Sequence, residues 1–458
     1  MKAQIAAGHP ATAEVGAEVL ADGGTAADAA VSASLASCVA EPVMTGLLSG
    51  GFAIYLDAAT RSVRNLDCFV AVPSGQGAPF IEVDIPFWGE LVPYFVGPAS
   101  FGVPGLAAGL DLLWREYGRL PWARLCEPAL RLARAGVPLS PTHAACLAET
   151  LAPVYTMNEG AAIYAPGGKL LGPGDIVEQP GVVRAVELLS DEGASSVYTG
   201  SISQALLALL EERGGAVTAT DLATYEPVWS RPVEVEYHGA HFHTRAGLSE
   251  VPETISHLPP LRDLSDTERV LAVVDVLGTP RADVPEHTTN LSVMDREGNV
   301  CVLTSSLGLC SGDWVPGLDL HLNSILGEKY LQRGELRPGD RMGSMMAPSI
   351  ALDGESFVLG IGSAGAARLR TAIVGVTAAI LDEGLEPQAA VDRPRFHRQD
   401  EVVNTEPGVD EEALAELERR GLEVRRWPER NYYFGGVSLV SRRGPAADPR
   451  RGGQAVEC

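Results

Sequence analysis

The sequence predicts a large mixed protein of helices and strands, of the α+β class, on three observations. The chain has 458 residues, 46% of them hydrophobic, which is enough to bury a substantial core. Segments with helical and with strand-like patterns alternate irregularly along it. It contains no internal repeat, no low-complexity linker and no run of 18 apolar residues. These features argue against wholesale disorder and against a membrane-spanning helix.

The helices are predicted from apolar periodicity and from capping residues. Thr25 and Asp28 form a capping-box sequence at the start of an alanine-rich helix, and Gly23-Gly24 end the helix before it. The segment 251–287, rich in Pro, Asp and His, is expected to be a surface connection with one helix. Helices are predicted at 11–21, 25–39, 105–117, 123–135, 178–190, 201–213, 265–278, 366–382 and 410–420.

The strands are predicted from short alternating or apolar runs bounded by turn residues. The clearest pair is 289–295 and 300–306, joined by a turn at 296–299. We expect 73–100, rich in Pro, Gly and aromatic residues, to be a loop. Further strands are predicted at 52–56, 63–66, 356–359, 422–425 and 436–441.

The charge balance argues against two classes of partner. The formal net charge is −24, whereas nucleic-acid binders usually carry a basic face and anionic membranes attract basic surfaces. We therefore expect neither a nucleic acid nor a membrane as partner. Only Lys2, Lys169 and Lys329 are lysines, which together with the abundant Ala and Gly is typical of a GC-rich bacterial genome.

The cysteines and the first residues indicate a reducing, cytoplasmic setting. The seven cysteines are an odd number without a CxxC pair, which disfavours a disulfide framework or a zinc ribbon. The segment 1–14 has no apolar core of the kind that export signals carry. We expect a cytoplasmic protein that binds no metal.

A glycine-rich segment at 360–365 fits GxGxxG between a predicted strand and a predicted helix. A dinucleotide site also needs an acid after a second strand, about 20 residues on. Asp382 and Glu383 instead lie at the predicted helix end. Three interpretations stay open: a nucleotide site, a tight turn without a ligand, and a turn whose backbone N–H groups hold an oxyanion.

Thr288 and Thr289 stand where the strand 289–295 begins. A hydroxyl nucleophile needs a base, and an N-terminal threonine carries one in its α-amine, whose pKa is about 7.7–8.0. An internal threonine gains that amine only when the preceding peptide bond, here His287–Thr288, is cut. Paired threonines are also an ordinary way to start a strand.

Together, these motifs resemble the γ-glutamyltransferase family of N-terminal-nucleophile hydrolases. Residues 288–299 match its TTH-x-SVxDxxGN signature, with Asn290 in place of the histidine. Other matches follow in order along nearly the whole chain: His9-Pro10, 23–31, Glu41-Pro42, 50–52, 103–105, 117–122, 127–129, 198–200, 221–225, Leu322-Asn323, 344–348, 393–397 and 448–452. The chain is short for the family mainly between about 250 and 285.

The resemblance implies a four-layer αββα sandwich, made as a precursor that cuts itself. Residues 1–287 would be the large-subunit segment and 288–458 the small-subunit segment, intertwined in one domain and associated after cleavage. Thr288 would be the nucleophile and His287–Thr288 the cleavage site. The hydroxyls of Thr304 and Ser306 would support it, and backbone N–H groups of Gly365 and Ala366 would hold the oxyanion. No cofactor and no metal are implied.

The residues that would hold a glutamyl group depart from the family pattern. Phe69 stands where the family has the arginine that clamps the substrate carboxylate, and Gly308 stands where it has an asparagine. Ile325 and Met345 replace a polar residue and a serine, which leaves Ser344 and the acid Glu328 at substrate-binding positions. Each lost hydrogen bond to a charged group costs roughly 1.5–3 kcal/mol. We therefore expect a small-molecule substrate other than an ordinary γ-glutamyl amide.

Three smaller features have both an ordinary and a functional interpretation. His238, His241 and His243 are either a metal cluster or a solvated strand end, and the strand end is favoured. Cys310 is either a pocket residue or a small buried side chain. Arg368 and Arg370 either lie on a helix surface or replace the missing carboxylate clamp.

The sequence thus predicts a self-processing N-terminal-threonine hydrolase or acyltransferase that works through an acyl-enzyme. One alternative within the class is a C–C bond-cleaving hydrolase of alkylproline antibiotic biosynthesis, as in specialised family members. Another, from a different class, is a binding or scaffold homologue that no longer cleaves itself. The intact Thr288 and its supporting hydroxyls argue against the scaffold.

Overall fold

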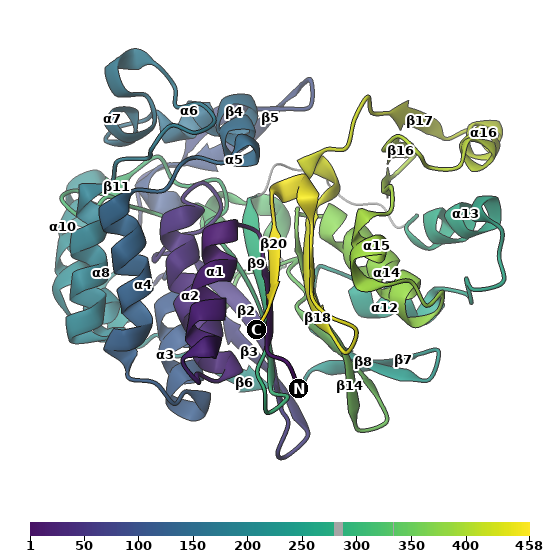
Figure 1. The fold of residues 1–458 in the computed structure, drawn as a ribbon. Coiled ribbons are helices and arrows are strands. Elements are labelled where there is room, and N and C mark those ends of the chain that lie inside the picture. Colours follow the sequence, from purple (N-terminus) through teal and green to yellow (C-terminus); the bar gives the residue numbers. More distant parts are fainter. Residues whose placement is uncertain (279–286, 333) are drawn as a thin grey trace.

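Two sheets lie face to face at the centre of the fold, and helices cover the outer side of each (Figure 1). The computed structural model describes residues 1–278, 287–332 and 334–458. The αββα sandwich implied by the sequence resemblance is confirmed. Residues 1–287 and 288–458 both contribute strands to each sheet, so neither segment forms a layer by itself.

The first sheet is antiparallel and has β9 and β10 near its middle. In spatial order its strands are β20 (Gln454–Glu457), β1 (Gln4–Ala7), β9 (Thr288–Met294), β10 (Val300–Ser306), β2 (Gly50–Asp57), β3 (Ser62–Cys68) and β6 (Val228–Ser230). The register pairs Thr288 with Ser306 and Asn290 with Thr304. Because directly opposed residues share a face of a sheet, these four side chains point to the same side.

The second sheet packs against that face. Its strands, in spatial order, are β19 (Ala446–Ala447), β18 (Gly436–Ser441), β14 (Ser356–Ala364), β13 (Ser349–Asp353), β8 (Ala240–Thr244) and β7 (Val233–Tyr237). A Cβ added at Gly362 of β14 would collide with the amide of Asn290 on β9. Glycine at this position therefore permits the close approach of the two sheets.

The helices divide between the two outer faces, and the first group covers the first sheet (Figure 1). The capping box of Thr25 and Asp28 starts α2, whose residues are all buried, many of them alanines that permit close packing on β9 and β10. This group comprises α1 (Pro10–Ala21), α2 (Ala26–Ala40), α3 (Leu106–Tyr117), α4 (Trp122–Ala135), α8 (Pro180–Glu192), α9 (Ser195–Tyr198), α10 (Ser201–Arg213) and α11 (Ala219–Ala223).

The second group of helices lies on the far side of the second sheet (Figure 1). It comprises α12 (Val251–His257), α13 (Asp266–Val276), α14 (Arg368–Leu381), α15 (Pro387–Asp392) and α16 (Glu411–Arg419). A small sheet of β15 (Phe396–Gln399), β16 (Val402–Thr405) and β17 (Glu423–Arg426) lies beside α16. Above the first group are the short helices α5 (Pro141–Cys146), α6 (Ala152–Tyr155) and α7 (Gly160–Tyr164), with the short pair β11 (Trp314–Val315) and β12 (Leu320–His321).

Several sequence-based predictions of local structure are wrong. The segment 73–100 is not a loop throughout, since β4 (Ile81–Phe87) and β5 (Glu90–Val96) form a hairpin across Trp88-Gly89. Each strand contains a proline, at 86 and 93, and because proline disfavours strands the sequence pattern did not predict them. The glycine-rich segment 360–365 is mostly strand β14 rather than a turn, and only 365–367 separate it from α14. The segment 251–287 also contains the unpredicted α12, and residues 279–286 of it lie outside the described chain.

Candidate active site

Thr288 is the first residue of β9 and is 1% exposed. The side-chain oxygen of Thr288 and both ring nitrogens of His287 are buried and have no hydrogen-bond partner among the described residues. Buried polar atoms in folded proteins are nearly always paired, so three such atoms at one peptide bond form an unusual group. The structure thus places an unpartnered hydroxyl at the peptide bond that the sequence marked for cleavage.

Ser306 contacts that same peptide bond. Its hydroxyl donates to the His287 carbonyl oxygen at 2.7 Å and accepts from the Gly308 N–H at 2.9 Å. A donor aimed at a carbonyl stabilises the negative charge that forms on the oxygen when a nucleophile adds to the carbon. Ser306 therefore lies where it can assist an attack on the His287 carbonyl.

Thr304 lies on the same face but is bonded to another residue. Its hydroxyl and the side-chain amide of Asn290 are 2.6 Å apart, a hydrogen bond that exists in either orientation of the amide. Ser292, two residues further along β9, donates to the Ser438 carbonyl of the second sheet at 2.8 Å. Thr288, Asn290 and Ser292 thus form a line of polar side chains along β9, between the two sheets.

Glu41 lies on the other side of the nucleophile, directly after α2. It is 1% exposed and accepts hydrogen bonds from Thr289 Oγ1 at 2.5 Å and from Thr12 Oγ1 at 2.7 Å. Burial raises the pKa of this carboxyl to about 7, although both hydroxyls and the charge of Arg451 lower it. In the sequence, Glu41 is noted only as part of the Glu41-Pro42 motif. The signal for it is an acid placed directly after an alanine-rich helix.

Gly365 and Ala366 form the turn between β14 and α14. Gly365 has φ 121° and Ala366 has φ 50°, so an alanine occupies the left-handed region that favours glycine. A Cβ on Gly365 would come within 2.9 Å of the Gly435 Cα atom. Among the described residues, no carbonyl accepts from either backbone N–H. The two groups thus remain available at the end of the strand whose last residue, Ala364, borders the same small cavity as Thr288.

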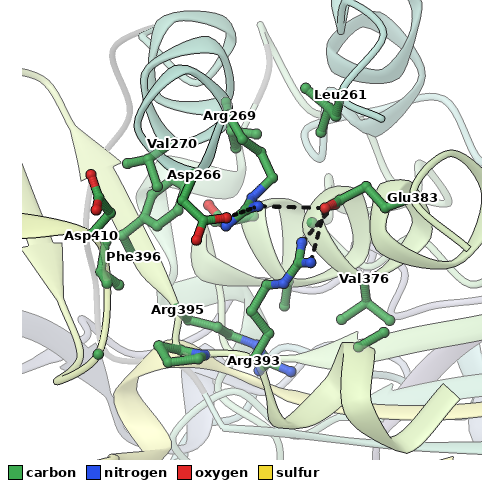
Figure 2. Close-up of a pocket in the computed structure, with 18 residues that line it drawn as sticks. Leu261, Asp266, Arg269, Val270, Val376, Glu383, Arg393, Arg395, Phe396 and Asp410 are labelled. Carbon is green, nitrogen blue, oxygen red and sulfur yellow. Dashed lines mark hydrogen bonds and ion pairs between the residues drawn. The ribbon is translucent and has the colours of Figure 1, made fainter. Parts of the chain in front are cut away.

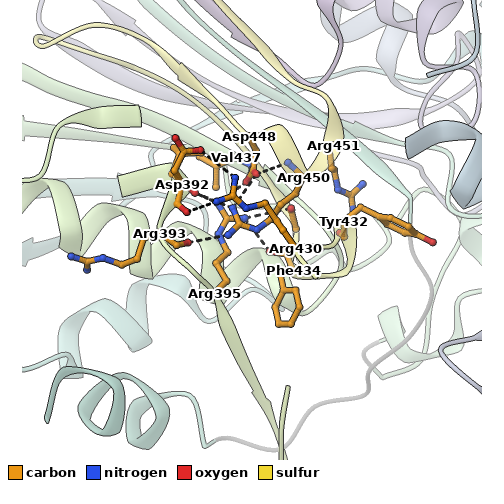
Figure 3. Close-up of polar contacts among 12 residues, drawn as sticks. Asp392, Arg393, Arg395, Arg430, Tyr432, Phe434, Val437, Asp448, Arg450 and Arg451 are labelled. Atoms are coloured by element: carbon orange, nitrogen blue, oxygen red, sulfur yellow. Dashed lines mark hydrogen bonds and ion pairs between the residues drawn. The ribbon is translucent and has the colours of Figure 1, made fainter. Parts of the chain in front are cut away.

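A buried network of arginines and acids anchors the C-terminal segment (Figure 3). Asp448 and Arg451 of this segment border the same small cavity as Thr288. Arg395 pairs with Asp448 at 2.6 Å, and Arg450 pairs with Asp448 at 3.2 Å. Asp448 also accepts from the Val437 N–H on β18 at 3.0 Å. This anchoring places the neighbouring Arg451 near His287, whose pKa is lowered to about 3 by burial and by the charges of Arg451 and Arg368. His287 is therefore neutral.

The predicted substrate-binding residue Phe69 is fully buried and packs against Phe52 in an apolar cluster. Its ring lies 5.2 Å from that of Phe52, and the guanidinium of Arg245 lies 3.6 Å above the Phe52 ring. Arg245 also donates to the Ser344 carbonyl at 3.0 Å and to the Met346 carbonyl at 3.3 Å. The structure thus brings together Phe69 and Ser344 with an arginine that the sequence analysis missed.

Arg245 forms no ion pair with any described residue, although the charge of Asp67 raises its pKa. In the described part of the chain, no carboxylate lies within ion-pair distance of it, and its Nε and Nη2 atoms donate to no residue. Burial lowers the pKa of Arg245 to about 10, so it stays charged at neutral pH. An unpaired and partly buried cation beside aromatic rings is a candidate anion site.

Gly308 and Glu328 lie against each other. A Cβ on Gly308, which has φ 68°, would collide with the Glu328 carboxylate. Glu328 accepts hydrogen bonds from the hydroxyls of Tyr94 and Tyr330, the latter at 2.6 Å. Tyr94 belongs to the hairpin that the sequence did not predict. The fully buried Ile325 packs in the same apolar cluster as Phe69 and Met345.

The arginines considered as substitute clamps have other contacts. Arg370 is buried, pairs with Glu250 at 3.3 Å and donates to the Leu277 carbonyl at 2.9 Å. Arg368 donates to the Tyr433 carbonyl at 3.2 Å and packs on the Tyr433 ring. Neither lies on a helix surface, because both are nearly inaccessible.

The histidine cluster lies at a strand end. His241 binds Glu234 at 2.7 Å across the β7–β8 hairpin, and His238 lies 3.7 Å from Asp382. Within the described residues, no group of three or more His, Cys, Asp or Glu side chains is arranged to hold a metal ion. Cys310 is buried, and burial raises the pKa of its thiol.

A cavity of about 420 Å³ lies elsewhere, among α13, α14 and α15 (Figure 2). Its charged side chains neutralise one another: Arg393 binds Glu383 at 2.6 and 2.9 Å, and Arg269 lies 3.6 Å from Glu383. Its Thr371 hydroxyl is bonded to His397 at 2.9 Å. This cavity lacks an unpartnered nucleophile, so the candidate active site remains at Thr288.

Comparison with known proteins identifies the class. The fold matches the crystal structure of cephalosporin acylase from Bacillus halodurans, with TM-score 0.82 and 23% identity over 99% of this chain and 95% of that one. It matches the structure of LmbA2991HD with TM-score 0.84 and 22% identity over 100% and 98%. The chain therefore shares the four-layer αββα fold of these two proteins.

Sequence comparison then gives the family. A family model described as Gamma-glutamyltranspeptidase matches residues 12–270 and 263–458, and the chain belongs to this family. It is 25% identical to a glutathione hydrolase proenzyme of Bacillus subtilis strain 168, over 96% of this chain and 90% of that protein. It is also 25% identical, with the same coverage, to the acylase ACY 1 proenzyme of Pseudomonas sp. strain SE83. None of the helices in the described segments is long and apolar enough to cross a membrane.

Proposed function

We propose that this chain is a precursor that cuts its own His287–Thr288 bond and then acts as an N-terminal-threonine hydrolase. The observation that carries the proposal is the contact of Ser306 Oγ with the His287 carbonyl, 2.7 Å, beside the unpartnered Thr288 hydroxyl. Two relatives are proenzymes by name, a glutathione hydrolase and an acylase, which supports a processed product. Cleavage would yield the segments 1–287 and 288–458.

In the mature protein the freed α-amine of Thr288 takes the proton from its own hydroxyl. The oxygen then attacks a substrate carbonyl, and an acyl-enzyme forms as the leaving group departs with a proton. The Gly365 and Ala366 N–H groups, which have no acceptor among the described residues, donate to the developing oxyanion. Water or an acceptor amine releases the acyl group.

The substrate differs from an ordinary γ-glutamyl amide and carries a carboxylate that binds Arg245. The guanidinium lies above the ring of Phe52 on β2. In the sheet register Phe52 pairs with Thr304, and Gly50 of the same strand pairs with Ser306. Neighbouring strands are about 4.8 Å apart and residues about 3.3 Å apart along a strand, so Phe52 and Thr288 are roughly 12 Å apart at Cα. An acyl group with a carboxylate several bonds from its carbonyl spans most of this distance. Phe69, Ile325 and Met345 supply apolar contacts along it.

A denaturing gel and N-terminal sequencing test the processing. Two bands, the smaller beginning at Thr288, are expected. A single uncut 48.2 kDa chain would favour the scaffold interpretation. A smaller fragment starting elsewhere would exclude Thr288 as the nucleophile.

Mass spectrometry of the group trapped on Thr288 tests the substrate. The mature protein is incubated with a panel of amides and oxo acids, quenched in acid and digested. An acyl adduct bearing a carboxylate supports the proposal, and an α-oxo acyl adduct would identify the C–C bond-cleaving alternative. Rapid turnover of glutathione or of a γ-glutamyl anilide would contradict it.

A further inference from the structure

A small cavity is bordered by both the nucleophile Thr288 and Glu41. It measures about 10 Å³ and is bordered by Thr288, Thr289, Glu41, His143 and Arg451, among others. A single water needs roughly 10–15 Å³ and two to four polar partners, so this cavity has the size and lining of a one-water site. Most of the residues that border it are buried, and Gly8 and Gly453 are half-buried.

We infer that Glu41 is the general base of self-cleavage, accepting the Thr288 hydroxyl proton through one water held in this cavity. The inference rests on the proposed cleavage at His287–Thr288. An uncut precursor needs such a base, because the Thr288 nitrogen is then an amide and cannot accept the proton. Glu41 is therefore a residue of maturation, distinct from the α-amine that serves the mature enzyme.

Self-cleavage by this route moves one proton from Thr288 to Glu41 and then returns it to the Thr288 nitrogen. The water takes the proton of Thr288 Oγ and passes one of its own to the Glu41 carboxylate, while Oγ bonds to the His287 carbonyl carbon. Ser306 donates to the resulting oxyanion. The C–N bond then breaks, and the Thr288 nitrogen takes the proton back from Glu41 through the same water. The product is an ester of His287 on Thr288, which a second water hydrolyses.

The surroundings favour Glu41 over the other groups at the cavity. His143 borders it with an unpartnered Nδ1, but burial and the nearby His9, Arg451 and His287 hold its pKa well below the ordinary value. Asp448 also borders it, but the two arginines lower the pKa of its carboxyl. Cys38 lies one turn before Glu41, and burial raises the pKa of its thiol. Arg451 lowers the pKa of Glu41 but stops short of ion-pair distance.

The rate of self-cleavage should rise with pH if Glu41 is the base. Only the ionised carboxylate accepts a proton, and the pKa of Glu41 is about 7. Cleavage should therefore speed up about tenfold per pH unit below neutrality and level off above it. The hydroxyl of Thr12 stabilises the ionised form, so its removal should raise this pKa and move the midpoint to higher pH.

The test uses full-length precursor made by cell-free synthesis, transferred to buffers from pH 5.5 to 9 and followed on gels. Glu41→Gln should slow cleavage at pH 8 by about 10²-fold or more and flatten the profile. Thr12→Val should shift the midpoint upward. N-terminal sequencing of the smaller fragment in each case tests the proposed cleavage site, whereas the rates test the assignment of Glu41 as the base.

Two outcomes would overturn the inference. If Glu41→Gln cleaves at the wild-type rate and with the wild-type pH profile, Glu41 is not the base. If the pH profile is flat in His143→Gln while Glu41→Gln keeps the wild-type midpoint, the base is His143. If Glu41→Gln does not fold, judged by its thermal transition, Thr12→Val decides. An unshifted midpoint in that variant contradicts the inference.

Discussion

The two sides of the candidate active site differ in how their polar groups are used. Around Thr288, hydroxyls are bonded to an amide, a carboxyl and a backbone carbonyl at 2.5 to 2.7 Å, and the Thr288 hydroxyl has no partner among the described residues. Around Phe69 the buried side chains are aromatic and aliphatic, and Arg245, which forms no ion pair with any described residue, lies beside them. The reacting groups are thus positioned mainly by the backbone of the central strands, whereas the cluster around Phe69 depends on side chains from several separate segments.

The largest effect is expected from removal of the nucleophile. Thr288→Ala should leave one uncut chain, because the variant lacks the hydroxyl that would attack the His287 carbonyl carbon. The measurement is a denaturing gel after prolonged incubation. Two bands in this variant would show that cleavage does not need Thr288.

The Ser306 contact should have the next largest effect. Ser306→Ala removes the donor to the His287 carbonyl and should slow maturation about 10²–10³-fold, as is typical for an oxyanion donor. Ser305→Ala is the matched control, since its hydroxyl faces the other way and contacts Thr45 at 2.9 Å. Equal cleavage rates in the two variants would argue against this role of Ser306.

The turn at 365–366 is tested on turnover rather than on maturation. A proline at 366 would confuse the result, because its φ of about −65° is incompatible with the observed 50°. Replacement of Ala366 by its α-hydroxy acid, lactic acid, exchanges only the N–H for an oxygen. Turnover should fall about 10²–10³-fold. Unchanged turnover would show that the Ala366 N–H does not hold the oxyanion and that the turn has only a structural role.

Arg245→Ala should weaken substrate binding on the apolar side. Loss of one charged hydrogen-bonding partner costs about 1.5–3 kcal/mol, which corresponds to a KM increase of about 10–150-fold. Arg64→Ala is the control, because Arg64 also lies over an aromatic ring, Trp229, but is paired with Glu116 at 2.6 Å. The KM is measured on the substrate identified by the trapped acyl group. An unchanged KM would show that Arg245 does not bind the substrate.

The smallest effect concerns backbone strain. Ala366→Gly keeps the N–H and relieves the left-handed conformation, which costs alanine about 1–2 kcal/mol, against about 0.5–1 kcal/mol of extra chain entropy. The melting temperature should rise by no more than about 2–4 °C. A fall in the melting temperature would mean that the methyl group of Ala366 contributes packing that outweighs the strain.

Much of the local structure could be predicted from the sequence. The capping box at Thr25, the hairpin of β9 and β10 and the αββα class follow from local patterns or from motifs in order along the chain. The position of Thr288 at the head of a strand also follows, because β-branched residues after a connecting segment mark a strand start.

Only the tertiary structure decided which groups meet. Glu41 and Thr289 are 248 residues apart, and Arg245 and Ser344 are 99 apart, so no local pattern links them. The same holds for Gly362, whose missing side chain is explained by Asn290 on the facing sheet rather than by a turn. Local propensity fixes where strands and helices begin, because it depends on neighbouring residues. The pKa of Glu41 and the unpaired charge of Arg245 depend on burial, which arises only when distant segments pack together.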